Sequence, residues 1–151
     1  MSEIEVRSLL RLTDGGLVPV EACAERPAGP QYVSGAIELI VDGVQIISVA
    51  EWDLVDQLWA YIANMIEELP KSGHTSTYFP DQPVELGFRR TSPGRLLVFC
   101  KVNGNLRQVS VDEAEFMAAI RSAGEVFFGE MMRLFPENEN LYRVARRKLA
   151  L

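Results

Sequence analysis

The chain contains 151 residues, of which 48% are hydrophobic and 24% are charged. These fractions exclude a disordered or fibrous protein, and the length suits one globular domain covering residues 1–151. The formal net charge of −6 argues against a nucleic-acid-binding protein that works through an overall basic surface.

Two strands are expected at the start of the chain. Residues 4–12 form an apolar, strand-like run that ends at a Thr-Asp-Gly-Gly turn. Residues 17–24 form the second strand, and Pro19 favours an edge position for it because proline has no backbone N–H to donate. Residues 26–30, rich in proline and glycine, are expected to form a loop.

A hairpin follows. Residues 36–41 and 44–49 are apolar strands that flank the pair Asp42-Gly43. This pair readily adopts positive φ, so it suits a two-residue type I′ turn.

Residues 52–69 carry the clearest helical pattern. The apolar side chains recur at a step of about 100° per residue, which predicts an amphipathic helix that Pro70 and then Ser72-Gly73 end. Ser48 and Glu51 have the spacing of a capping box. The acidic residues of this helix fall together on the face opposite the apolar one: Asp53, Asp56 and Glu67.

Three more strands form a predicted meander after an irregular stretch at residues 71–83. Alternation of apolar and polar residues predicts a strand at 84–89. Residues 95–102 and 105–111 flank Asn103-Gly104, which has the same turn chemistry as the first hairpin.

Two helices are expected at the end of the chain. The first begins near Asp112, with capping-box spacing from Ser110 to Glu113, and Gly124 in its apolar stripe indicates close approach of another element. Pro136 opens the second, at residues 137–150. Its expected buried residues are Leu141, Val144, Ala145 and Leu149.

The element order is therefore ββββαβββαα. Strands grouped in hairpins with helices between the groups predict an α+β domain. We expect an antiparallel sheet of about seven strands, with three helices covering one face.

Motifs for catalysis, metal binding or phosphate binding are absent from the sequence. The single histidine, His74, lies near Asp81 and several hydroxyl groups, but no nucleophile elbow accompanies it. One His and the scattered Cys23 and Cys100 do not have the spacing of a zinc site. No cofactor is expected, and each cysteine lies in an apolar run typical of a small buried side chain.

The location of the protein is expected to be cytoplasmic. The first residues are acidic and lack the basic and apolar regions of a secretory signal. No apolar run reaches the length of a membrane-spanning helix, so no membrane partner is expected.

Charge is unevenly distributed along the chain. Residues 1–70 hold 12 acidic and 3 basic side chains, a balance of −9, whereas residues 71–151 hold 9 acidic and 12 basic ones, a balance of +3. A negative patch attracts cationic proteins and speeds their encounter. The basic cluster near the C-terminus is explained by its position at a helix end, so no nucleic-acid partner is expected.

Aromatic residues border the acidic ones. Trp52 and Trp59 fall on the shoulder of the predicted helix between its apolar and acidic faces. Aromatic anchors beside charge are common at binding hot spots, although large aromatics are also highly buried on average. The candidate partner-binding residues are Asp53, Asp56, Trp59, Glu67, Tyr78, Phe79 and Asp81.

In kind, the chain resembles the immunity proteins of bacterial toxin systems, including contact-dependent growth inhibition. The features that carry this resemblance are the acid-rich first half, the helix WDLVDQLWAYIANMIEEL and the segment YFPDQP. The resemblance implies a non-enzymatic protein that binds a cationic, often nuclease-like toxin domain. It would neutralise that domain by covering its active site or another essential surface.

Two alternatives stay open at the level of sequence. One is a small-ligand-binding or enzymatic domain that uses a pocket between sheet and helices, with His74 and Asp81 near its mouth. The other is a homodimer or structural subunit whose edge strands pair between chains, either the first two strands or those of the meander.

Overall fold

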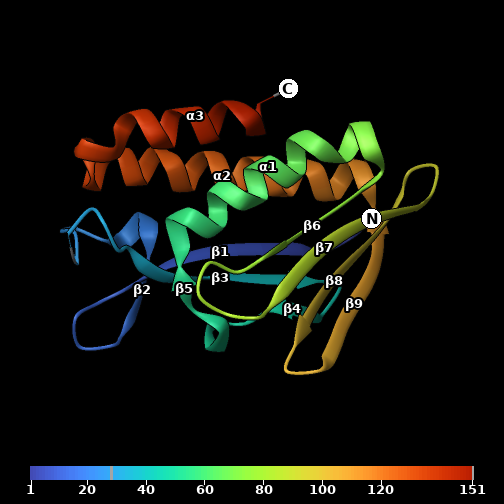
Figure 1. Ribbon diagram of the computed structural model, residues 1–151, viewed down its shortest axis with the longest axis horizontal. Helices are drawn as coiled ribbons and strands as arrows, with labels where there is room; N and C mark the ends of the chain where they lie inside the picture. The colour runs from blue at the N-terminus through green and yellow to red at the C-terminus, as the bar shows by residue number, and fades with distance from the viewer. Residues whose placement is uncertain (28, 151) are drawn as a thin grey trace.

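Sheet A, the first of two antiparallel sheets, has the strand order β2-β1-β3-β4, and the short β5 also pairs with β3 (Figure 1). The computed structural model describes residues 1–27 and 29–150; Ala28, in the predicted loop, and Leu151 lie outside the described residues. The strands of sheet A are β1 (Ile4–Arg11), β2 (Leu17–Pro19), β3 (Ser34–Val41), β4 (Val44–Ile47) and β5 (Asp53–Leu54).

Sheet B has the strand order β6-β7-β8-β9. Its strands are β6 (His74–Tyr78), β7 (Glu85–Ser92), β8 (Arg95–Val102) and β9 (Asn105–Asp112). The two sheets meet where β4 lies beside β9. Both predicted hairpin turns are confirmed, because Asp42 and Asn103 have positive φ angles of 49° and 50° and the strands on either side of each pair directly.

Three α-helices lie together on one side of the sheets (Figure 1). They are α1 (Val55–Ser72), α2 (Glu113–Leu134) and α3 (Glu139–Leu149), and there are 3-10 turns η1 (Val20–Ala22), η2 (Val49–Glu51) and η3 (Pro136–Asn138). The α+β class and the three helices are confirmed. The expectation of one sheet of about seven strands is corrected to nine strands in two sheets within the described residues. The two added strands, β5 and β6, are short and polar.

The first helix begins later and ends later than its pattern predicted. The capping box of Ser48 and Glu51 exists, but it caps η2, and α1 starts only at Val55. Pro70 lies inside the last turn of α1, where its missing N–H removes one intrahelical hydrogen bond, and the helix nevertheless continues to Ser72. The helix ends at Gly73, whose φ of 77° is the left-handed conformation that glycine adopts freely.

The last two helices correct the sequence prediction in detail. Asp112, not Ser110, caps α2 by accepting a hydrogen bond from the backbone N–H of Glu115. In α3 the buried residues are Tyr142, Ala145 and Leu149. The expected burial of Leu141 and Val144 is wrong, since they are 70% and 52% exposed. Packing of α3 against both α1 and α2 turns the Tyr142 face inward.

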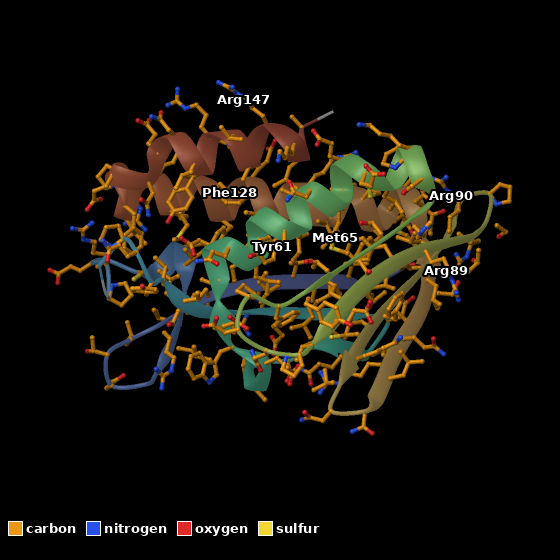
Figure 2. All side chains as sticks on the ribbon, in the orientation of Figure 1. Tyr61, Met65, Arg89, Arg90, Phe128 and Arg147 are labelled. Atoms are coloured by element: carbon orange, nitrogen blue, oxygen red, sulfur yellow. The ribbon has the colours of Figure 1, made fainter. Side chains whose placement is uncertain are left out.

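A single hydrophobic core fills the space between the two sheets and beneath the helices. Trp59 of α1 is at its centre among the helices and stacks on Phe127 with ring centroids 5.8 Å apart. Phe128, labelled in Figure 2, contacts the same indole edge-on. The close approach predicted at Gly124 is confirmed, because a Cβ there would lie 2.4 Å from Leu149 Cδ1 and 2.9 Å from Trp59 Cζ3.

Candidate functional site

Asp53 is a structural residue. It lies in β5, ahead of the helix on which it was placed, and its side chain is only 4% exposed. Its carboxylate accepts hydrogen bonds from the backbone N–H of Asp81 at 3.1 Å and from Gln82 Nε2 at 2.9 Å. These bonds fix the connection between β6 and β7 to β5. The expectation that Asp53 presents its charge to a partner is corrected.

Asp56 is also tied inside the fold. It lies in the first turn of α1, and Tyr142 of α3 donates its phenolic hydrogen to Asp56 Oδ2 at 2.9 Å. Burial raises the pKa of Asp56, against the opposing effect of the bond from Tyr142. Burial likewise raises the pKa of Tyr142, and the nearby Asp56 carboxylate adds to this. The pair therefore joins two helices.

Two of the three predicted aromatic anchors, Trp59 and Phe79, are buried. Trp59 is completely enclosed, and its Nε1 donates to the Ser8 hydroxyl at 2.9 Å. Phe79 is 3% exposed. The structure thus corrects their placement at the surface, because α1 is enclosed by sheet strands and two other helices. The other tryptophan, Trp52, is 43% exposed and lies 4.3 Å from the guanidinium of Arg11.

Glu67 and Tyr78 do lie at the surface, and Glu67 lines a shallow groove between α1 and β6. This α1–β6 groove has a volume of about 390 Å³. Its lining residues are Tyr61, Asn64, Met65, Glu67, Glu68, Thr75, Ser76 and Thr77. Figure 2 shows Tyr61 and Met65 along the side of α1 that faces β6. Tyr78 follows on β6 and is 62% exposed.

The groove carries two glutamates, and the ammonium group of Lys148 donates to Asn64 Oδ1 in its lining. Glu67 and Glu68 are exposed, and neither forms an ion pair within the described residues. The sequence analysis missed Tyr61 and Glu68. The signal was present, because residues 61, 64, 65 and 68 follow helical spacing and so share one face of α1. The missing information was that β6 lies beside that face.

His74 and Asp81 do not come together. His74 lies opposite Arg89 at the start of β6, in a broad hollow of about 750 Å³ that also includes Arg90 and the turn after it. Figure 2 shows the two arginines at this end of sheet B, away from Tyr61. Asp81 lies beyond the other end of β6 and lines a different cavity, with Trp52 and Gln82. The expected pocket shared by His74 and Asp81 is therefore not formed.

The two cysteines are separate buried thiols. Cys23 Sγ donates to the Glu25 carbonyl at 3.0 Å. Cys100 is fully enclosed in sheet B, and burial raises the pKa of its thiol to about 12. Within residues 1–27 and 29–150, no group of three or more His, Cys, Asp or Glu side chains could hold a metal ion.

No helix in the described part of the chain is both long and apolar enough to cross a membrane. Comparison with protein-family models, with curated proteins and with solved structures finds no match to this chain.

Proposed function

We propose that this protein is a non-enzymatic binding module that recognises a basic protein through the α1–β6 groove. The observation that carries the proposal is the pair of exposed, unpaired carboxylates, Glu67 and Glu68, beside two tyrosines at the groove and its end. Tyrosine supplies a large contact area with a polar tip and is enriched at binding hot spots. The carboxylates supply attraction to a cationic partner.

The partner class is proposed from charge and from the resemblance in kind to bacterial immunity proteins. A net charge of −6 attracts a cationic domain at long range, and the groove provides the local complement. In this proposal the module covers the active site or an essential surface of a toxin domain, such as a nuclease, in the cytoplasm. Tyr61 and Tyr78 supply contact area, and the two glutamates supply orientation and association rate.

The test is capture of the partner from the native cell with tagged protein, followed by identification of bound proteins by mass. We compare the wild type with a Glu67→Lys/Glu68→Lys variant. The matched control is Glu25→Lys/Glu125→Lys, because both of these side chains are exposed and the net charge changes equally. The expected result is one basic protein that the wild type and the control retain and the groove variant loses.

Once that basic protein is purified, its association rate with each variant is measured at low and at high salt. The groove variant should associate at least about tenfold more slowly at low salt, and the difference should shrink at high salt because screening shortens the range of attraction. A partner that is equally retained by all three proteins would place binding on another surface. A partner that is acidic would reject the proposed class. His74→Ala should leave binding unchanged, since His74 lies outside the groove.

A further inference from the structure

Part of β1 has an open edge. On one side β1 pairs with β3 from Ile4 to Leu10. On the other side β2 pairs only with residues 9–11 of β1. Within the described residues, the stretch from Ile4 to Ser8 therefore has no neighbouring strand on that side.

The backbone of this stretch is oriented for pairing. The carbonyl oxygen of Glu3 accepts a hydrogen bond from the N–H of Asp42, so Glu3 faces the β3 side. Backbone groups of successive residues point to opposite edges of a strand. The N–H and C=O groups of Ile4 and Val6 therefore point toward the open side.

A cleft with a mixed lining of apolar and polar residues, including Glu21, runs along the open edge. It has a volume of about 330 Å³ and lies between β1, η1 and α2. Ile4 and Val6 line it from the strand, and both are only partly buried. Val126 lines it from α2 and is 48% exposed, and the short side chains of Ala119 and Ala123 leave space beside it.

We propose that a second copy of this chain occupies this edge, with its own β1 antiparallel to the first. The two-fold axis passes through Val6, the midpoint of the open stretch, so that Val6 pairs with the partner's Val6 and Ile4 lies opposite the partner's Ser8. Residues 4–8 of each chain are then all paired with residues of the other chain. The pairing stops where β2 begins to pair with β1. The partner's Ile4 and Val6 enter the cleft beneath α2.

Charge selects this register. Glu5 and Arg7 point away from the helices, and in this register Glu5 lies opposite the partner's Arg7 on both sides of the axis. Shifting the partner strand by two residues in one direction places Glu5 opposite the partner's Glu5, and shifting it by two residues in the other direction places Arg7 opposite the partner's Arg7. Like charges directly opposite each other destabilise a strand pair, so the register centred on Val6 is favoured.

A dimer of this kind is closed. Each copy uses its open edge once, and the same surface serves both chains, as a two-fold interface requires. The interface does not include the α1–β6 groove, so it is independent of the proposed function. The sheet of the dimer is continuous through β3, β1 and the partner's β1 and β3.

The test is analytical ultracentrifugation of the full chain over a wide range of concentration. The wild type should dimerise. Glu5→Arg should weaken the dimer about tenfold or more, because two cross-strand ion pairs become two pairs of like charge. Glu67→Arg is the matched control; it makes the same charge change in the α1–β6 groove and should leave the dimer intact.

Arg7→Glu should weaken the dimer to a similar extent, and together with Glu5→Arg it tests whether these charges face each other across the interface. Mixing the Glu5→Arg and Arg7→Glu proteins should give a heterodimer, because every facing pair then has opposite charge. Arg7 also pairs with Glu38 at 3.3 Å within the chain, so thermal unfolding confirms that the variant folds. A monomeric wild type, a Glu5→Arg protein that dimerises normally, or a mixture that stays monomeric would each overturn the proposal.

Discussion

Gly124 and Gly129 both lie on α2, but only Gly124 is closely packed against other side chains. A Cβ at Gly124 would collide with the enclosed side chains of Leu149 and Trp59, whereas a Cβ at Gly129 would have no atom within 4 Å. Glycine lowers helix stability relative to alanine at both positions by about 1 kcal/mol. The close packing of α2 against α1 and α3 therefore explains the first glycine, and it does not explain the second.

We expect Gly124→Ala to destabilise the protein and Gly129→Ala to stabilise it. Overpacking a core costs about 1–3 kcal/mol, which outweighs the gain in helix propensity at position 124. At position 129 that gain of up to about 1 kcal/mol remains. Urea unfolding of both variants measures the two free energies. Equal shifts in the same direction would show that packing at Gly124 is loose.

Residue-level burial could be predicted only in part. The periodicity of residues 52–69 identified the helix and most of its apolar face, yet it placed Trp59 on the edge of that face. The structure encloses α1 from several sides, by strands of both sheets and by the two other helices, so its buried face is wider than one amphipathic stripe. Asp53 was misplaced because the helix begins at Val55.

An ion pair between Arg107 of β9 and Glu51 of η2 joins the two sheets. Arg107 of β9 points into the junction and donates to Glu51, the last residue of η2, at 2.6 Å. It also donates to the Ile46 carbonyl of β4 at 3.3 Å. Glu51 is 7% exposed. Burial raises the pKa of Glu51, but the hydrogen bonds from Arg107 and Ser48 outweigh it and hold that pKa below its ordinary value.

We expect Glu51→Gln to destabilise the protein by about 1.5–3 kcal/mol at neutral pH, because the partly buried hydrogen bond from Arg107 loses its charged acceptor. The pKa of Glu51 is lower in the folded than in the unfolded chain. The ionised carboxylate therefore stabilises the fold above the ordinary glutamate pKa, and this contribution disappears as pH falls through the lowered value. The difference between wild type and variant should thus shrink in acid.

Urea unfolding at a series of pH values measures that difference. Glu85→Gln is the matched control, since its pair with Lys101 spans 3.6 Å at the surface and should contribute less than about 1 kcal/mol. A Glu51→Gln variant with the same pH dependence as the wild type would show that the link carries no charge-dependent stability.

Elements were predictable where the sequence carries a strong local signal. The two turns Asp42-Gly43 and Asn103-Gly104 set the register of their hairpins, and each strand pair forms as expected. The strand β6 was not predicted, because His-Thr-Ser-Thr-Tyr has no apolar alternation. Its formation depends on pairing with β7 and on packing beside α1, and both of these contacts are tertiary.

One core extends through both sheets and all three helices. We therefore expect a single unfolding transition in which Trp59 fluorescence and far-UV circular dichroism coincide in urea. Trp52→Phe makes Trp59 the only tryptophan and leaves the core unchanged, since Trp52 is exposed. Two separate transitions would show that sheet B or the helices unfold independently.

The distribution of charge over the whole molecule could not be inferred from the two halves of the sequence. Ion pairs link the halves, as in Glu51 with Arg107 and Arg26 with Glu137. The acidic first half and the basic second half therefore do not form two opposite faces. The two exposed glutamates of the groove have no ion-pair partner within the described residues.

The enclosed thiol of Cys100 can be used to measure how often sheet B opens in the folded protein. Only the thiolate reacts with alkylating reagents, and a pKa of about 12 leaves almost none of it in the folded chain at neutral pH. In a Cys23→Ala background, labelling of Cys100 would therefore record each opening of sheet B that admits the reagent. At reagent concentrations where labelling is faster than reclosing, the rate at which the label accumulates gives the lifetime of the closed state, without a denaturant and without a folding probe.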